Sequence, residues 1–196
     1  MNRLGLDDAA VIEASRAEPE RFAPLFDRHA PYIHRYLARR IGRQAADDLV
    51  AETFLVAFRK RARYDPSHHD ARPWLYGIAT NLIAQHRREE ARQFRLRQAA
   101  GPDPVQHDWA ERSALDVTAQ SLRAPLTQAL ARLARPDRDV LLLIAWEQLT
   151  YDEVARALSI PVGTVRSRLN RARTKIREAL AGTPAAATYE EILTNE

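Results

Sequence analysis

Apolar residues recur every three or four positions along most of the chain, and no stretch alternates between apolar and polar residues as a β-strand does. The helical pattern covers about residues 19–97, stops, and resumes from about residue 116 to 180, with a break at Arg135 and Pro136. The intervening sequence AAGPDPVQHD has a glycine, two prolines and no apolar rhythm, which is typical of a linker. The pattern predicts an all-α protein in which a flexible linker joins two small helical domains.

These changes of pattern set the predicted domain bounds. We expect an N-terminal extension over residues 1–18, a helical domain over 19–98, a linker over 99–122, a second helical domain over 123–180 and a C-terminal tail over 181–196. The longest purely apolar run, VLLLIAW, is much shorter than the roughly 20 residues that a membrane span needs. The acidic N-terminal segment lacks the pattern of a signal peptide, so we expect a cytoplasmic protein.

The second domain contains the pattern of a helix-turn-helix. Thr150 and Glu153 form the T-x-x-E pattern of a capping box, which predicts the start of a helix. One face of that helix is apolar and consists of Tyr151, Val154, Ala155 and Leu158. The sequence Ser-Ile-Pro at 159–161 ends it, and a second helix is expected from about Val162.

At about 100° per residue, the second helix buries a stripe of apolar residues, namely Val165, Leu169, Ala172, Ile176 and Leu180. The opposite face carries short polar groups and one arginine, namely Ser167, Asn170, Arg171 and Thr174. Cations flank this face, with Arg166, Arg173 and Arg177 on one side and Arg168 and Lys175 on the other. This layout suits a DNA-reading helix, because short groups reach base edges while long cations reach phosphates. An ordinary solvated face is the alternative, but such faces mix charges, and this one has no acid before Glu178.

Two helices of the first domain carry candidate partner surfaces. The helix expected over residues 47–63 is apolar on all but a narrow strip of Asp48, Glu52 and Arg59, so it is either central in its domain or shared with a partner. The helix expected over residues 72–90 buries Leu75, Ile78, Ala79 and Leu82. Its aromatic residues could stack on unpaired bases and its arginines could hold a nucleic-acid backbone, or the aromatics are half-buried packing residues.

Composition narrows the chemistry further. Lys60 and Lys175 are the only lysines among 30 basic residues, and the sequence pI is about 9.7. Arginine binds phosphate and guanine edges, although a GC-rich genome would also enrich it. The absence of cysteine excludes disulfides, thiolate metal sites and a cysteine nucleophile. A metal cluster of His68, His69 and Asp70 is disfavoured because adjacent loop histidines point apart, so we expect no metal and no cofactor.

Three motifs occur in the order found in sigma factors of bacterial RNA polymerase. DDLVAETFLVAFRK resembles region 2.2, ARPWLYGIATNLIAQHRRE resembles regions 2.3 and 2.4, and LTYDEVARALSIPVGTVRSRLNRARTKIREAL resembles region 4.2. The chain most resembles the short, two-domain extracytoplasmic-function (ECF) group, over about residues 22–97 and 126–180.

The resemblance implies roles for individual residues. Core polymerase binding falls on Asp48, Leu49, Glu52 and Phe54. Opening and holding of the −10 element falls on Trp74, Tyr76, Asn81, Arg87 and Arg88. Recognition of the duplex −35 element falls on Arg166, Ser167, Asn170 and Arg171. We add Thr164, Arg168 and Lys175 of the same helix to the predicted −35 set.

The same resemblance implies that the partners are core RNA polymerase, promoter DNA and an anti-sigma protein, and that the chain has no catalytic residue. A free-standing helix-turn-helix regulator of duplex operators is the main alternative, although the first domain lacks the strand-helix alternation of a receiver domain. A nucleic-acid enzyme that uses His68, His69 and Asp70 is a further alternative, and it predicts metal-dependent turnover.

Overall fold

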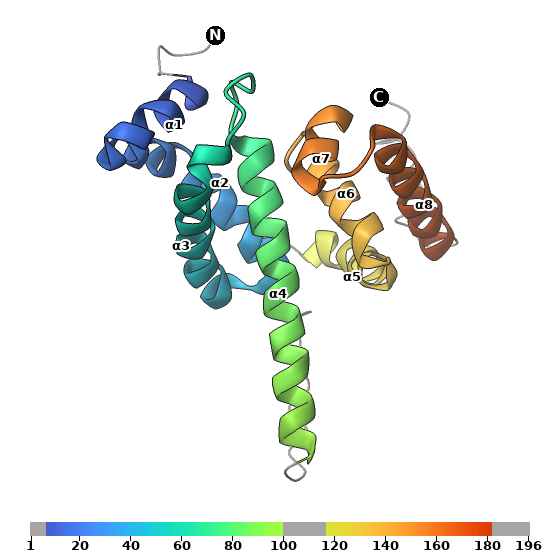
Figure 1. Ribbon diagram of the computed structural model, residues 1–196. Coiled ribbons are helices and arrows are strands. Elements are labelled where there is room, and N and C mark those ends of the chain that lie inside the picture. Colours follow the sequence, from blue (N-terminus) through green and yellow to red (C-terminus); the bar gives the residue numbers. More distant parts are fainter. Residues whose placement is uncertain (1–6, 100–116, 182–196) are drawn as a thin grey trace. The chain divides into compact units, whose positions relative to one another are not determined.

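The structure is a computed structural model that describes residues 7–99 and 117–181 (Figure 1). Over these ranges it contains helices and no strand, which confirms the all-α prediction there. In chain order the elements are α1 (Asp8–Ala17), the 3-10 turn η1 (Pro19–Phe22), α2 (Ala23–Ile41), α3 (Arg43–Lys60), η2 (Arg61–Arg63), α4 (Arg72–Ala99), α5 (Val117–Arg132), α6 (Arg135–Ala145), α7 (Tyr151–Leu158) and α8 (Val162–Leu180). Among them, no helix combines the length and the hydropathy that a membrane crossing requires.

The chain divides into two compact units. The first contains α1 to α4, and the second contains α5, α6, most of α7, and α8. The expected linker and tail fall largely on residues 100–116 and 182–196, which lie outside the described residues.

The core of the first unit forms where α2, α3 and α4 pack together. Two edge-to-face aromatic pairs join α3 to the start of α2. The ring centroids of Phe22 and Phe58 lie 5.3 Å apart, and those of Phe26 and Phe54 lie 4.9 Å apart. Each pair uses a spacing of four residues on both partners, which places the rings on one face of each element. The apolar face of α3 therefore turns toward α2.

Gly42 sets the turn between α2 and α3. Its backbone φ is +83°, a conformation that favours glycine, and its N–H donates to the carbonyl of Ala38 at 3.0 Å. This bond closes the last turn of α2 and redirects the chain at once into Arg43 and α3.

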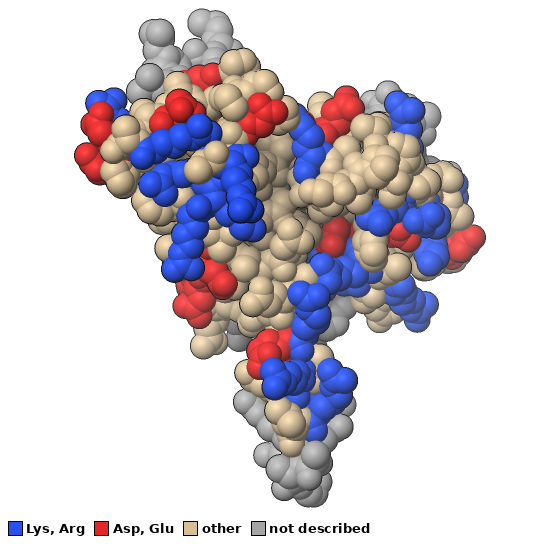
Figure 2. Space-filling model, viewed as in Figure 1, with Lys and Arg blue, Asp and Glu red and all other residues tan. Residues whose placement is uncertain are grey.

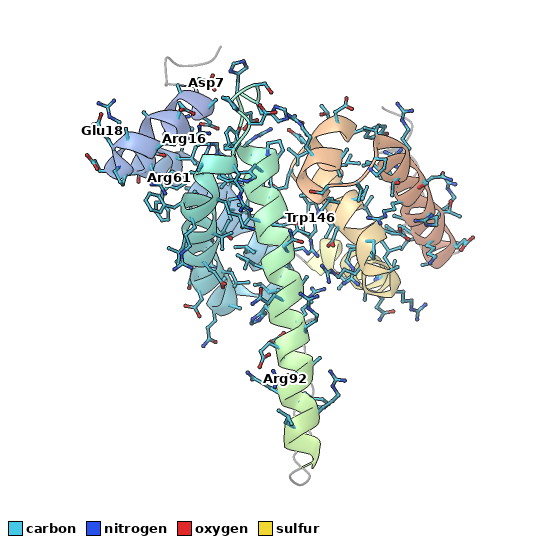
Figure 3. All side chains as sticks on the ribbon, in the orientation of Figure 1. Asp7, Arg16, Glu18, Arg61, Arg92 and Trp146 are labelled. Atoms are coloured by element: carbon cyan, nitrogen blue, oxygen red, sulfur yellow. The ribbon has the colours of Figure 1, made fainter. Side chains whose placement is uncertain are left out.

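The N-terminal helix α1 is part of the first unit, so the prediction of an extension over residues 1–18 is wrong for Asp8–Ala17. Val11 is 4% exposed and Ile12 is fully buried. Two hydrogen bonds from arginine side chains to backbone carbonyls fix the C-terminal end of α1. Arg16 donates to the carbonyl of Tyr64 at 3.2 Å, and Arg61 donates to the carbonyl of Ser15 at 3.1 Å (Figure 3). The pattern misled because α1 is short and acidic, and its burial depends on residues about 50 positions away.

In the second unit, α6 and α8 pack together around Val140, Leu143, Val165, Leu169 and Ile176. Helix α5 begins at Val117, inside the linker predicted over 99–122. The predicted capping box is confirmed at the start of α7. The Thr150 N–H donates to the Glu153 carboxylate at 2.7 Å, and the Glu153 N–H donates to Oγ1 of Thr150 at 3.3 Å.

The predicted helix-turn-helix is also confirmed. Helix α7 ends at Leu158, and Ser159 takes a positive φ of 53° that reverses the chain. The Ile160 N–H donates to the carbonyl of Ala155 at 2.9 Å, and α8 begins directly after Pro161. Proline suits this position because it donates no backbone hydrogen bond at a helix start.

Candidate functional site

A buried carboxylate fixes the start of α4, the helix that carries the candidate −10 residues. Asp8 is 5% exposed and accepts a hydrogen bond from the backbone N–H of Ala71 at 2.9 Å. The same carboxylate also contacts Nε2 of His29, at 2.8 Å, and the guanidinium of Arg28. Burial alone would raise the pKa of Asp8, but the bonds from His29 and Ala71 and the positive charge of Arg28 bring it below its usual value. Asp8 therefore holds α1, α2 and the first turn of α4 together.

The loop before α4 is bound to its surroundings residue by residue. The Tyr64 hydroxyl donates to the carbonyl of His68 at 2.6 Å, His69 pairs with Asp7, and the Asp70 carboxylate accepts from the N–H of Arg72 at 2.8 Å. The side chains of the three candidate metal ligands have three different partners, because Nδ1 of His68 lies 2.9 Å from Oγ of Ser67, His69 pairs with Asp7, and Asp70 pairs with Arg72. Over residues 7–99 and 117–181, no group of three His, Cys, Asp or Glu side chains is arranged to hold a metal ion.

Trp74 is the half-buried aromatic at the start of α4. Its ring packs on Tyr64, with centroids 4.8 Å apart and ring planes tilted by 55°. Burial, together with the nearby Asp8 carboxylate, raises the pKa of Tyr64, so this ring remains a neutral packing partner. Asn81 and Arg88 follow Trp74 at intervals of seven residues, which places all three on one side of α4, and both are exposed.

Tyr76, which was predicted to contact DNA, is buried in the free chain. Its side chain is 1% exposed, and its ring packs edge-to-face on Tyr36 with centroids 5.3 Å apart. No ring face remains for a base. Arg87 is also engaged in the fold, because it donates to the carbonyl of Arg40 near the C-terminal end of α2 at 2.9 Å. Of the predicted −10 set, Trp74, Asn81 and Arg88 form one stripe along α4, and the half-buried Arg87 is tied to α2.

From Glu89 to Leu96 the side chains of α4 are mostly exposed, and the helix continues past the other helices of its unit (Figure 1). Figure 2 shows basic side chains along this part of the helix, which are all arginines because α4 has no lysine. Arg92 and Arg95 project from it, together with the exposed apolar Leu96, and Arg92 is labelled in Figure 3. We did not predict these positions as site residues, although their basic character was visible in the sequence.

Helix α3 presents a narrower partner surface than predicted. Leu49 and Phe54, which were predicted to bind a partner, are 7% and 5% exposed and belong to the core of the free chain. Asp48 and Glu52 are exposed as predicted. Leu55 is 46% exposed and lies on the same side, three residues after Glu52. The surface is therefore two carboxylates beside one exposed leucine, and Leu55 is the member that the sequence analysis missed.

Helix α8 matches its predicted faces closely. The five residues of the predicted apolar stripe are all buried. The predicted −35 residues are exposed or half-buried, namely Thr164, Arg166, Ser167, Arg168, Asn170, Arg171 and Lys175. The Ser167 hydroxyl donates to the carbonyl of Thr164 at 3.0 Å, which leaves its lone pairs as acceptors. A polar, cationic face thus runs along the helix opposite its packed side.

One residue of this face has an acidic partner from another helix. Arg171 donates from Nε and from one terminal nitrogen to the two carboxylate oxygens of Asp137, at 3.4 and 3.1 Å. Asp137 lies in the first turn of α6 and is 4% exposed, whereas the Arg171 side chain is 54% exposed. Sequence analysis did not reveal this pair, because the two residues are 34 positions apart.

Comparison with known proteins places these features in one family. The family model for Sigma-70 region 2 matches residues 25–93, and the model for Sigma-70, region 4 matches residues 123–176. The ECF RNA polymerase sigma factor SigL of Mycobacterium tuberculosis is 33% identical over 173 residues, which cover 88% of this chain and 96% of SigL. The chain belongs to the ECF RNA polymerase sigma factors. Leu49, Phe54 and Tyr76 are thus core residues of a sigma factor.

Other relatives of this sigma factor differ in length. CarQ of Myxococcus xanthus is 33% identical over 165 residues, which cover 82% of this chain and 90% of CarQ. BldN of Streptomyces coelicolor is 31% identical over 167 residues, and the chain spans 62% of its length.

Solved structures show the same fold at lower identity. The sigma factor RpoE of Bartonella quintana, in complex with the anti-sigma factor NepR, aligns with a TM-score of 0.60 at 23% identity over 82% of this chain and 97% of that chain. CnrH in complex with the cytosolic domain of CnrY gives a TM-score of 0.62 at 23% identity over 90% of this chain and 97% of that chain.

Proposed function

We propose that this sigma factor binds core RNA polymerase, directs it to particular promoters and opens the −10 element. The observation that carries the proposal is the outer face of α8. From Pro161 to Arg177 the sequence has six basic residues and no acidic one, and the apolar stripe on the opposite side is buried. A helix held by one face while the other presents short polar groups and cations is suited to the major groove of a duplex −35 element.

Helix α4 supports a second DNA contact of a different kind. Trp74 rests on Tyr64 at one end of the stripe, and Asn81 and Arg88 follow it along the helix. An aromatic ring offers stacking to an unpaired base, while the amide and the guanidinium offer hydrogen bonds to bases and phosphates. We propose that this stripe holds the −10 element as a single strand, and that capture of unstacked bases supplies the energy for opening.

The exposed side of α3 is the proposed polymerase contact. Two carboxylates, Asp48 and Glu52, lie there beside the apolar side chain of Leu55, which is exposed and not packed in the core. This combination suits a basic partner surface with a small apolar recess.

The proposal places the chemistry of RNA synthesis in the polymerase, so this chain needs no catalytic residue of its own. Polymerase and promoter DNA meet in the bacterial cytoplasm, where we propose that the protein acts. By analogy with RpoE and CnrH, whose structures contain NepR and CnrY, we also propose that an anti-sigma protein controls it.

Co-elution with purified bacterial core RNA polymerase, followed by run-off transcription from the gene's own upstream region and from genomic fragments, tests the proposal. We expect a stable complex and transcripts with defined start sites that core polymerase alone does not produce. The alternative of a free-standing regulator predicts specific duplex binding by the chain alone and no co-elution. That result, obtained with folded protein, would refute the sigma-factor function.

A further inference from the structure

The pair formed by Arg171 and Asp137 brings an acidic side chain to a stretch of α8 that has no acid of its own before Glu178. Asp137 reaches the outer face of α8 through its ion pair with Arg171. It comes from α6, not from α8 itself, and it is almost completely buried while its partner is half exposed. The pair therefore spans from the interior of the second unit to the proposed DNA surface.

The geometry of the pair leaves half of the guanidinium available. Asp137 accepts from Nε and from one terminal nitrogen, which together form one edge of the planar group. The other terminal nitrogen and the remaining hydrogen of the first form a second edge with two parallel donors. Two parallel donors match the O6 and N7 atoms of guanine as well as the two oxygens of a phosphate.

The backbone of Asp137 is fixed in the first turn of α6. Its backbone N–H donates to the carbonyl of Ala134 at 3.1 Å, and its position in the first turn of α6 places the carboxylate at the positive end of the helix dipole. A buried carboxylate that is fixed by its own helix restricts the rotamers of the arginine that it binds. The side chain of Arg171 thus reaches the DNA surface already ordered, which lowers the entropy lost on binding.

We propose that Asp137 is a positioning residue that sets the base preference of this sigma factor at the −35 element. It aims one edge of Arg171 at a base pair, and its negative charge offsets the attraction of Arg171 for any nearby phosphate. The proposal rests on the proposed −35 contact of α8. It predicts that loss of the Asp137 charge weakens discrimination between sequences while it strengthens binding to DNA of any sequence.

A purely structural role makes a different prediction. If the pair only joins α6 to α8, its loss lowers stability and weakens binding to every promoter by the same factor. The buried stripe of α8, from Val165 to Leu180, does not depend on the pair, so we expect Asp137→Asn to fold. The ratio of affinities for matched and mismatched promoters separates the two roles, because a uniform loss leaves that ratio unchanged.

The test is a double-mutant cycle in the holoenzyme. Wild type, Asp137→Asn, Arg171→Ala and the double variant are assembled with core polymerase and bound to a promoter from the transcription assay and to its single-base −35 variants. At one −35 position we expect Asp137→Asn to lower the matched-to-mismatched ratio by about tenfold, with higher affinity for mismatched DNA. In the Arg171→Ala background, the same change should leave the ratio unaltered.

Two further variants complete the design. Glu178→Gln removes one negative charge from an exposed position of α8 that has no shown contact with Arg171, and it should leave the ratio unchanged. Arg171→Lys keeps the charge but lacks the paired donors, so it should lose the preference as Asp137→Asn does.

Equal effects of Asp137→Asn on all promoters, or the same effect with and without Arg171, would overturn the proposed role while the −35 contact stands. A wild-type holoenzyme with no preference at any −35 base would overturn the −35 contact as well. Thermal unfolding of each variant shows whether a lower matched-to-mismatched affinity ratio results from unfolding of the variant.

Discussion

The carboxylate of Asp8 accepts a hydrogen bond from the backbone N–H of Ala71, 63 residues later in the chain. Ala71 directly precedes α4, and its carbonyl accepts the first bond of that helix from the Leu75 N–H at 2.9 Å. The N-terminal helix thus caps the helix that carries the proposed −10 surface. The bond stabilises α4 through both the contact itself and the favourable position of a negative charge at a helix start.

Removal of this charge should weaken the first unit. We expect Asp8→Asn to lower the free energy of unfolding by about 2 kcal/mol at neutral pH, because charged hydrogen bonds to His29 and Arg28 are lost in a buried place. Glu13→Gln, an equal change of charge on the exposed side of α1, is the control and should change stability little. Urea unfolding measures both.

The pH dependence of the same contact has a defined sign. Since the pKa of Asp8 is below its usual value of about 3.9, the folded state favours the carboxylate, and the contribution is fully present above that value. It is lost as the pH falls through the lower pKa of the folded state. The difference in stability between wild type and Asp8→Asn should therefore shrink as urea titrations are moved from pH 6 to pH 3. A difference that stays constant over this range would contradict the assignment.

Two neighbouring aromatic residues should behave differently on truncation. Tyr76→Ala removes a fully packed ring and should cost about 3 kcal/mol or more of stability. Trp74→Ala should cost less stability, because Trp74 is half exposed, and should instead reduce opening of the −10 element. Urea unfolding and permanganate reactivity of −10 thymines in the holoenzyme measure the two effects. Full promoter opening by Trp74→Ala would refute its proposed contact.

Charge reversal on α3 should block assembly. Glu52 is exposed, so we expect Glu52→Arg to fold normally and to weaken polymerase association by at least about tenfold, through repulsion from a basic partner surface. Glu20→Arg changes the charge equally at another exposed position of the first unit and serves as the control. Circular dichroism verifies the fold, and co-elution with core polymerase gives the result. Normal co-elution of Glu52→Arg would place the contact elsewhere.

Lys175 should contribute to the affinity for −35 DNA but not to the preference between −35 sequences. It lies beside the polar face of α8, and a lysine binds phosphate as a point charge. We expect Lys175→Ala to weaken binding to matched and mismatched −35 sequences alike and to reduce the salt dependence by about one counterion. Titrations of the holoenzyme at several salt concentrations, with Arg171→Ala in parallel, would show the contrast, since Arg171→Ala should change the preference.

Sequence predicted the second unit well because its signals are local. The capping box of Thr150 and Glu153 needs only four residues, and the stripe of α8 follows from its period alone. The first unit was harder. Helix α3 is apolar on most sides, so its pattern could not tell that Leu49 faces inward and Leu55 outward. The pattern of a helix shows which side faces the core only when the other side is polar.

For Tyr76 the sequence did contain a usable signal. Residues two apart on a helix point about 200° away from each other, so Trp74 and Tyr76 could not both face the same strand of DNA. The contacts of Asp8 with Ala71 and of Arg171 with Asp137 had no such signal, since they join residues 63 and 34 positions apart. Pairs of this kind depend on how helices pack, which periodicity does not determine.

The role of α1 bears on how the protein is divided for experiments. The match to Sigma-70 region 2 begins at residue 25, whereas the first unit includes Val11 and Ile12 in its core and Asp8 at the start of α4. A fragment cut at the family boundary would expose the apolar surface that α1 covers and would leave His29 and the Ala71 N–H without their carboxylate. The segment that matches the family is thus shorter than the segment that has to fold together. A fragment made for experiments should therefore start before residue 8 and keep α1 whole.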